Sequence, residues 1–153
     1  MKTYTLKQQK VLLEATELLK NSVRDSGPIA NDPKQAIQLI RTQIELAGAE
    51  REHFVVLFLD ARHRLIESKI LFSGTIDGAE VYPRIVLQHA LQLNAAAVVL
   101  AHNHPSNNPE PSAADHALTG RLKQALALVD IRLLDHFIIA GITHISFTEK
   151  GWL

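Results

Sequence analysis

Polar residues between positions 102 and 115 have the types and the spacing of a metal site that activates water. His102 and His104 are two residues apart after an apolar run, so extended backbone points both imidazoles to one side. Asp115 follows Ser112 by three residues, the spacing of an acid and an N-cap in a capping box at a helix start. Two imidazoles and one carboxylate predict a single divalent ion, zinc for preference, with an open position for water.

The alternative is that these histidines bind no metal, because a His-x-His pair alone is often a surface or capping feature. The intervening loop carries Pro105, Pro109 and Pro111, and a stiff loop loses less entropy when Asp115 folds back toward the histidines. The chain has no cysteine. Thiolate zinc sites, cysteine nucleophiles and a zinc deaminase are therefore excluded.

The elements that must position these residues follow from apolar periodicity, proline and glycine. Helices are predicted at 6–23, at 33–47, in 80–94 with Pro83 at the helix start, and at 113–128. Strands are predicted at 53–59 and 65–72 as a hairpin, at 95–101, and at 131–140 and 143–147 on either side of Gly141. Gly74 and Gly78 separate the hairpin from the third helix. This order predicts an α/β fold in which helices flank a mixed sheet.

Side-chain patterns predict which faces are buried. The first helix should bury Val11, Leu12, Ala15, Leu18 and Leu19, and the third Val86, Leu87, Ala90 and Leu91. Segment 95–101 is apolar throughout, which is typical of a strand covered on both faces in the middle of a sheet. The histidines therefore follow a central strand.

The full pattern His-x-His, seven residues, Ser, two residues, Asp resembles the JAMM motif of the JAB/MPN metalloprotease superfamily. More narrowly, the sequence resembles the RadC family, also called UPF0758. The matching segments are HNHPS at 102–106, PEPS at 109–112, LDHFIIAG at 134–141 and FSGTIDGAEVYPR at 72–84. The resemblance covers residues 32–153 and implies a JAB/MPN-like, cytidine-deaminase-like domain there, after an N-terminal helical segment at 1–31. Longer relatives carry a helical DNA-binding-type module for which residues 1–30 are too few, so the chain resembles the short forms on mobile elements.

The resemblance also implies roles. Zinc would be held by His102, His104 and Asp115, and Ser112 would help to stabilise a tetrahedral intermediate, although a helix cap is an equal interpretation. An upstream glutamate would be the general acid/base. Glu52 is the best positional match and Glu50 the second, while the alternative is that both are solvated charges.

Other positions carry weaker expectations. Asn107 stands where relatives usually have Gly, and Asn tolerates a positive φ, so the loop should keep its shape. Ile85 stands where relatives usually have Glu. His136 either lies behind the metal ligands or is a hydrogen-bonded core residue, and the core interpretation is favoured. His116 should point away from the metal and lie at the surface.

The function that these observations favour is a zinc-dependent hydrolase of a peptide or isopeptide bond. The alternatives are a DNA-repair or mobile-element accessory protein and a metal-stabilised scaffold without turnover. Lys plus Arg and Asp plus Glu both total 16, and aromatic residues are 5% of the chain, so nucleic-acid binding has little support. A peptide or protein substrate, a possible homodimer, no membrane partner and a cytoplasmic location are expected, since no secretory signal or apolar run of about 20 residues occurs.

Overall fold

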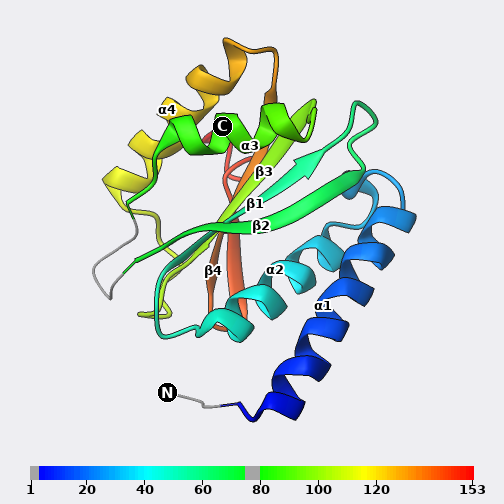
Figure 1. Cartoon of the computed structure of the whole chain (residues 1–153). Coiled ribbons are helices and arrows are strands. Elements are labelled where there is room, and N and C mark those ends of the chain that lie inside the picture. The colour runs from blue at the N-terminus through cyan, green and yellow to red at the C-terminus, as the bar shows by residue number, and fades with distance from the viewer. Residues whose placement is uncertain (1–3, 75–79) are drawn as a thin grey trace.

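The computed structural model describes residues 4–74 and 80–153. In that part of the chain one five-stranded sheet is flanked by helices (Figure 1). The elements are α1 (Leu6–Asp25), η1 (Ile29–Asn31), α2 (Pro33–Ala47), β1 (His53–Leu59), β2 (Leu65–Ser73), α3 (Pro83–Gln92), β3 (Ala97–Asn103), α4 (Ala113–Ala127), β4 (Arg132–Ala140) and β5 (Thr143–Ser146). Gly78 of the predicted turn, with the rest of 75–79, lies outside the described residues. The predicted α/β class and mixed sheet are confirmed.

The strands lie in the order β2-β1-β3-β4-β5, so β3 is the central strand, as its continuous apolar sequence predicted. β1 and β2 form the predicted antiparallel hairpin, and β1 also pairs antiparallel with β3. β3 and β4 are parallel, and β5 returns antiparallel beside β4. The strand predicted at 95–101 is displaced by two residues, to Ala97–Asn103, and it therefore includes His102.

The two faces of the sheet are covered by different helices. Every residue of β1 is buried, and alternate side chains enter different cores. Val55, Leu57 and Leu59 pack with α2, whereas Phe54 and Phe58 pack on the side of α3 and α4. Figure 1 shows the same division, with α1 and α2 on one side of the sheet and α3 and α4 on the other.

α1 buries the predicted face only in part, with Leu12, Ala15 and Leu19 half-buried. Val11 and Leu18 are 55% and 69% exposed, while Thr16 and Val23 are buried. The buried stripe passes through Thr16, because its hydroxyl donates to the Leu12 carbonyl at 2.9 Å and so needs no water. None of the helices in 4–74 and 80–153 combines the length and the hydropathy that crossing a bilayer requires.

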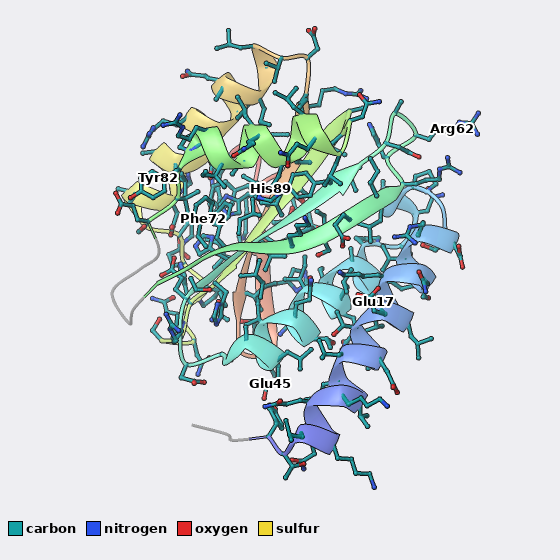
Figure 2. The ribbon with its side chains drawn as sticks, in the orientation of Figure 1. Glu17, Glu45, Arg62, Phe72, Tyr82 and His89 are labelled. Atoms are coloured by element: carbon teal, nitrogen blue, oxygen red, sulfur yellow. The ribbon has the colours of Figure 1, made fainter. Side chains whose placement is uncertain are left out.

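The predicted helix boundaries that rest on caps are confirmed. Asp32 caps α2 and Pro33 occupies its first turn, while Gly48 with φ 103° ends it. α3 begins at Pro83, and the Tyr82 ring before it lies 6.2 Å from that of Phe72 in β2 (Figure 2). Within α3, Val86 and Ala90 are buried as predicted, but Leu91 is 56% exposed. The burial prediction for Leu91 is wrong because α3 presents a narrower face to the sheet.

Candidate metal centre

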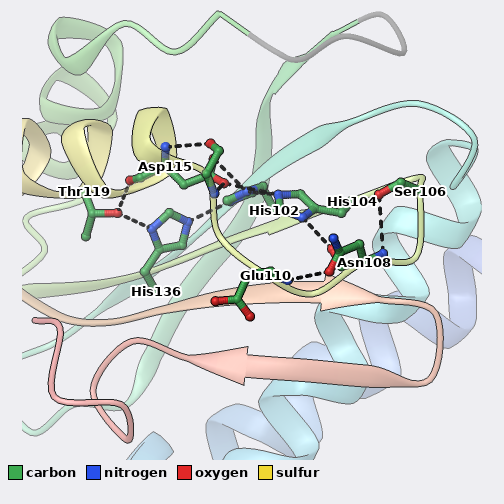
Figure 3. Close-up of polar contacts among 9 residues, drawn as sticks. His102, His104, Ser106, Asn108, Glu110, Asp115, Thr119 and His136 are labelled. Atoms are coloured by element: carbon green, nitrogen blue, oxygen red, sulfur yellow. Dashed lines mark hydrogen bonds and ion pairs between the residues drawn. The ribbon is translucent and has the colours of Figure 1, made fainter.

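The end of β3 and the start of α4 bring the three predicted ligands together (Figure 3). His102 Nε2 lies 3.2 Å from Asp115 Oδ1, and His104 Nε2 lies 3.3 Å from Asp115 Oδ2. The two Nε2 atoms are 3.0 Å apart. One potential ligand atom from each residue therefore lies within 4.8 Å of the others.

Backbone groups hold two of these side chains. His104 Nδ1 lies 2.8 Å from the Asn108 carbonyl, which can only accept, so Nδ1 carries the proton and Nε2 keeps its lone pair. Ser112 caps α4 as predicted: its Oγ accepts the Asp115 N–H at 3.1 Å, and Asp115 Oδ2 accepts the Ser112 N–H at 2.7 Å. The carboxylate is thus aimed by the capping box itself.

The electrostatics favour an ionised Asp115. Burial acts to raise the pKa of this carboxyl, but the neighbouring rings of His102 and His104 outweigh burial and hold the pKa well below its usual range. The Asp115 carboxylate, which accepts a hydrogen bond from the protonated ring, raises the pKa of His104 against burial, with smaller contributions from the Asn108 carbonyl and the charge of Glu52. The centre therefore attracts positive charge, from a proton or from a metal ion.

A cavity of about 510 Å³ opens on the three residues. Its wall includes Glu52, the preferred candidate for the general acid/base, and does not include Glu50. The strand register explains this placement. Phe54 is paired with His102 across β1 and β3, and Glu52, two residues before Phe54, falls on the same side of the sheet.

Ser112 also lines this cavity. Its oxygen accepts the Asp115 N–H, which confirms the helix-cap interpretation, yet the hydroxyl proton is not used by that bond. The side chain is exposed and can donate to a group in the cavity. Both interpretations of Ser112 are thus compatible with one geometry, and the oxyanion role stays a prediction.

Two further histidines of the sequence analysis, His136 and His116, differ in depth. His136 is completely buried in β4, and its Nε2 lies 2.8 Å from His102 Nδ1. It is therefore a hydrogen-bonded core residue, as favoured, whose partner is a predicted ligand. Burial, with the nearby His102, lowers its pKa well below the usual value, which keeps the imidazole neutral. His116 is exposed, as predicted, and its ring packs 5.0 Å from that of Phe147.

Asn103 is a residue of the site that the sequence analysis missed. It points to the α2 side of β3, where its Oδ1 accepts the His53 N–H at 2.8 Å. Its Nδ2 donates to the carbonyls of Ala49 at 3.2 Å and Arg51 at 2.8 Å. The Asn103 side chain thus holds in place the segment that carries Glu52. The sequence signal that could have found Asn103 was an amide side chain between two histidines, directly after a run of apolar strand residues.

Thr119 is the second missed residue. Its Oγ1 lies 2.7 Å from His136 Nδ1 and 2.7 Å from the Asp115 carbonyl. The signal was its position four residues after Asp115, which places both on one face of α4. Asn107, by contrast, has φ 60°, so the expected positive φ at this position is confirmed.

These donors suit a metal ion. Two imidazole nitrogens and a carboxylate are a common set for divalent ions with an open coordination position. The three side chains each place one ligand atom within 4.8 Å of the others, at the wall of the cavity. A cation placed between these atoms could offset the negative charge of the Asp115 carboxylate. The fold and the site together define an α/β domain with a His-His-Asp centre at the end of its central strand.

Comparison with known proteins identifies the family. Residues 30–152 match the family model described as a RadC-like JAB domain. A UPF0758 protein of Vibrio cholerae is 53% identical over 146 residues, covering 95% of this chain and 90% of that protein. A UPF0758 protein of Xanthomonas axonopodis pv. citri is 62% identical over 132 residues, covering 86% of this chain. The chain belongs to the RadC-like JAB domain family, as the motif resemblance predicted.

Several relatives are longer than the matched region. The chain spans 64% of a UPF0758 protein of Vibrio parahaemolyticus, to which it is 49% identical over 146 residues. It spans 58% of the Xanthomonas axonopodis relative. The family assignment therefore concerns the JAB domain and its centre.

Proposed function

We propose that this chain is a zinc-dependent hydrolase of the JAMM type that cleaves a peptide or isopeptide bond. The observation that carries the proposal is the meeting of His102, His104 and Asp115 at the wall of a cavity that Glu52 also lines. A ligand set alone would serve a structural ion equally well. A carboxylate outside the set, facing the same cavity, is what hydrolysis adds to metal binding.

In this proposal the metal would be held by the Nε2 atoms of His102 and His104 and by the Asp115 carboxylate. A zinc ion bound there would act as a Lewis acid that polarises the scissile carbonyl, and it would lower the pKa of a water molecule toward neutrality. The neutral imidazoles and the ionised carboxylate leave one positive charge, which favours a nucleophilic water and an oxyanion.

The chain's own groups would move the protons. The Glu52 carboxylate accepts a proton from the attacking water and passes it to the amine that leaves when the carbon–nitrogen bond breaks. The Ser112 hydroxyl donates to the oxygen that gains negative charge. Its oxygen is already held by the Asp115 N–H, so the donor is oriented before a substrate arrives.

The first experiment is elemental analysis of the protein purified without added metal. We expect about one zinc per chain, lost in Asp115→Asn, which removes the charge but keeps the shape of the side chain in the capping box. Glu110→Gln, in the same loop and outside the ligand set, is the matched control and should keep the metal. Zinc retained in Asp115→Asn, or absent from all three proteins, would contradict the proposal.

The second experiment tests turnover with fluorogenic peptides and lysine-isopeptide conjugates. Glu52→Gln should keep its zinc and lower cleavage by about 10²- to 10⁴-fold, whereas the matched change Glu50→Gln should leave cleavage close to wild type. Stoichiometric zinc without cleavage of any conjugate would favour the metal-stabilised scaffold instead.

A further inference from the structure

A buried chain of hydrogen bonds runs behind His102 (Figure 3). It begins at the carbonyl of Asp115, passes through the Thr119 hydroxyl and the His136 imidazole, and ends at His102 Nδ1. The three distances are 2.7, 2.7 and 2.8 Å. Thr119, His136 and His102 are only 3%, 0% and 1% exposed, so water does not compete for these groups.

The direction of the first two hydrogen bonds follows from the chemistry of the groups. A backbone carbonyl only accepts, so the Thr119 hydroxyl proton is directed to the Asp115 oxygen. A hydroxyl has one proton, and Thr119 Oγ1 must therefore accept from its second partner, His136 Nδ1. The proton of His136 is thereby placed on Nδ1.

The direction of the third hydrogen bond follows from that of the first two. With its proton on Nδ1, neutral His136 offers a lone pair at Nε2, which must accept from His102 Nδ1. His102 then carries its proton on the far side from the cavity. Its Nε2, which faces His104 and Asp115, is left with a lone pair.

We propose that Thr119 and His136 are positioning residues that fix His102 in the tautomer whose Nε2 can bind the metal. The inference rests on the proposed zinc site. The buried chain of hydrogen bonds is needed because Asp115 Oδ1, 3.2 Å from His102 Nε2, would otherwise favour a proton on that nitrogen. The opposite tautomer would place a hydrogen atom on the ligand position itself.

The first test reads the tautomer directly, by long-range ¹⁵N–¹H correlation NMR of the histidine rings in wild-type apoprotein. His136 should be protonated at Nδ1 and bare at Nε2, and His102 should be protonated at Nδ1. A proton on His136 Nε2 would overturn the proposal. This reading needs no variant and no metal, so it stands even if the chain binds no zinc.

The second test compares Thr119→Val with Thr119→Ser. Val has the shape of Thr without the hydroxyl, so it removes the acceptor for His136 Nδ1, whereas Ser retains it. Thr119→Val should weaken Zn²⁺ binding by about 10- to 100-fold and shift His136 toward the Nε2-protonated form. Thr119→Ser should keep both the wild-type tautomer and an affinity close to wild type.

Thermal unfolding of each apoprotein shows whether the variants are folded. A folded Thr119→Val protein with wild-type zinc affinity would overturn the proposed positioning role of Thr119 and His136 while leaving the zinc site in place. A wild-type protein that binds no zinc would instead contradict the proposed function, whatever the NMR result. If Thr119→Val does not fold, His136→Phe removes the Nε2 acceptor and should produce the same loss of zinc affinity.

Discussion

His102 and His104 stand two residues apart at one strand end, yet the protein supports them differently. His102 lies within β3, is 1% exposed, and stacks on Phe54 with ring centroids 6.2 Å apart. His104 follows the strand, is 16% exposed, and rests on the carbonyl of Asn108. One ligand is therefore held by the hydrophobic core, and the other by a loop that contacts the cavity.

Because the two ligands are supported differently, we expect that loss of metal and loss of fold can be separated at a single site. A ligand supported by a loop can be removed without disturbing buried partners. A ligand supported by the core leaves a buried polar group behind when it is removed. Three predictions test this separation.

The largest effect is expected from the matched pair His102→Ala and His104→Ala. Both should lose stoichiometric zinc, measured by elemental analysis. Only His102→Ala should also destabilise the apoprotein, by about 1–3 kcal/mol, because His136 Nε2 then has no donor in the core. His104→Ala should stay within about 1 kcal/mol of wild type in urea unfolding. Equal destabilisation of both apoproteins would contradict the comparison.

An intermediate effect is expected from Asn103→Ala, on the opposite face of the same strand end. The change removes three hydrogen bonds, to His53, Ala49 and Arg51, and should lower the free energy of unfolding by about 1–3 kcal/mol. Zinc content should remain, since no ligand is touched, but cleavage should fall because Glu52 is no longer fastened.

The control for Asn103→Ala is Asn107→Gly. Gly accepts the positive φ of this position, so stability should change by about 0.5 kcal/mol or less. A loss of zinc in Asn103→Ala would show instead that the amide supports the ligands themselves.

The smallest effect concerns pH. Hydrogen bonding to Asp115 raises the pKa of His104, so in the apoprotein this ring keeps its proton to a higher pH than an ordinary histidine. Zinc must displace that proton, and the apparent zinc affinity should therefore rise with pH and level off above the raised pKa. Titrations between about pH 6 and pH 9 measure the effect. In Asp115→Asn, which should lose its zinc, the His104 ring of the apoprotein should give up its proton at a lower pH.

Much of the site was predictable because it is local in sequence. The two-residue spacing of His102 and His104 uses the alternation of a strand, and the three-residue spacing of Ser112 and Asp115 uses the geometry of a helix start. Both were confirmed. The central position of β3 followed from its unbroken apolar sequence, since only a strand covered on both faces tolerates it.

The tertiary structure decided whatever depends on contacts distant in sequence. His136 reaches His102 because β4 lies parallel to β3, which neither segment reveals alone. Glu52 faces the cavity because the register sets Phe54 opposite His102, whereas Glu50 lies outside the wall. The prediction for α1 was wrong at Val11 and Leu18 for the same reason: periodicity identifies an apolar stripe, but packing decides which of its residues are covered. The sequence by itself determined which residues could bind a metal, and the fold determined what stands behind and opposite them.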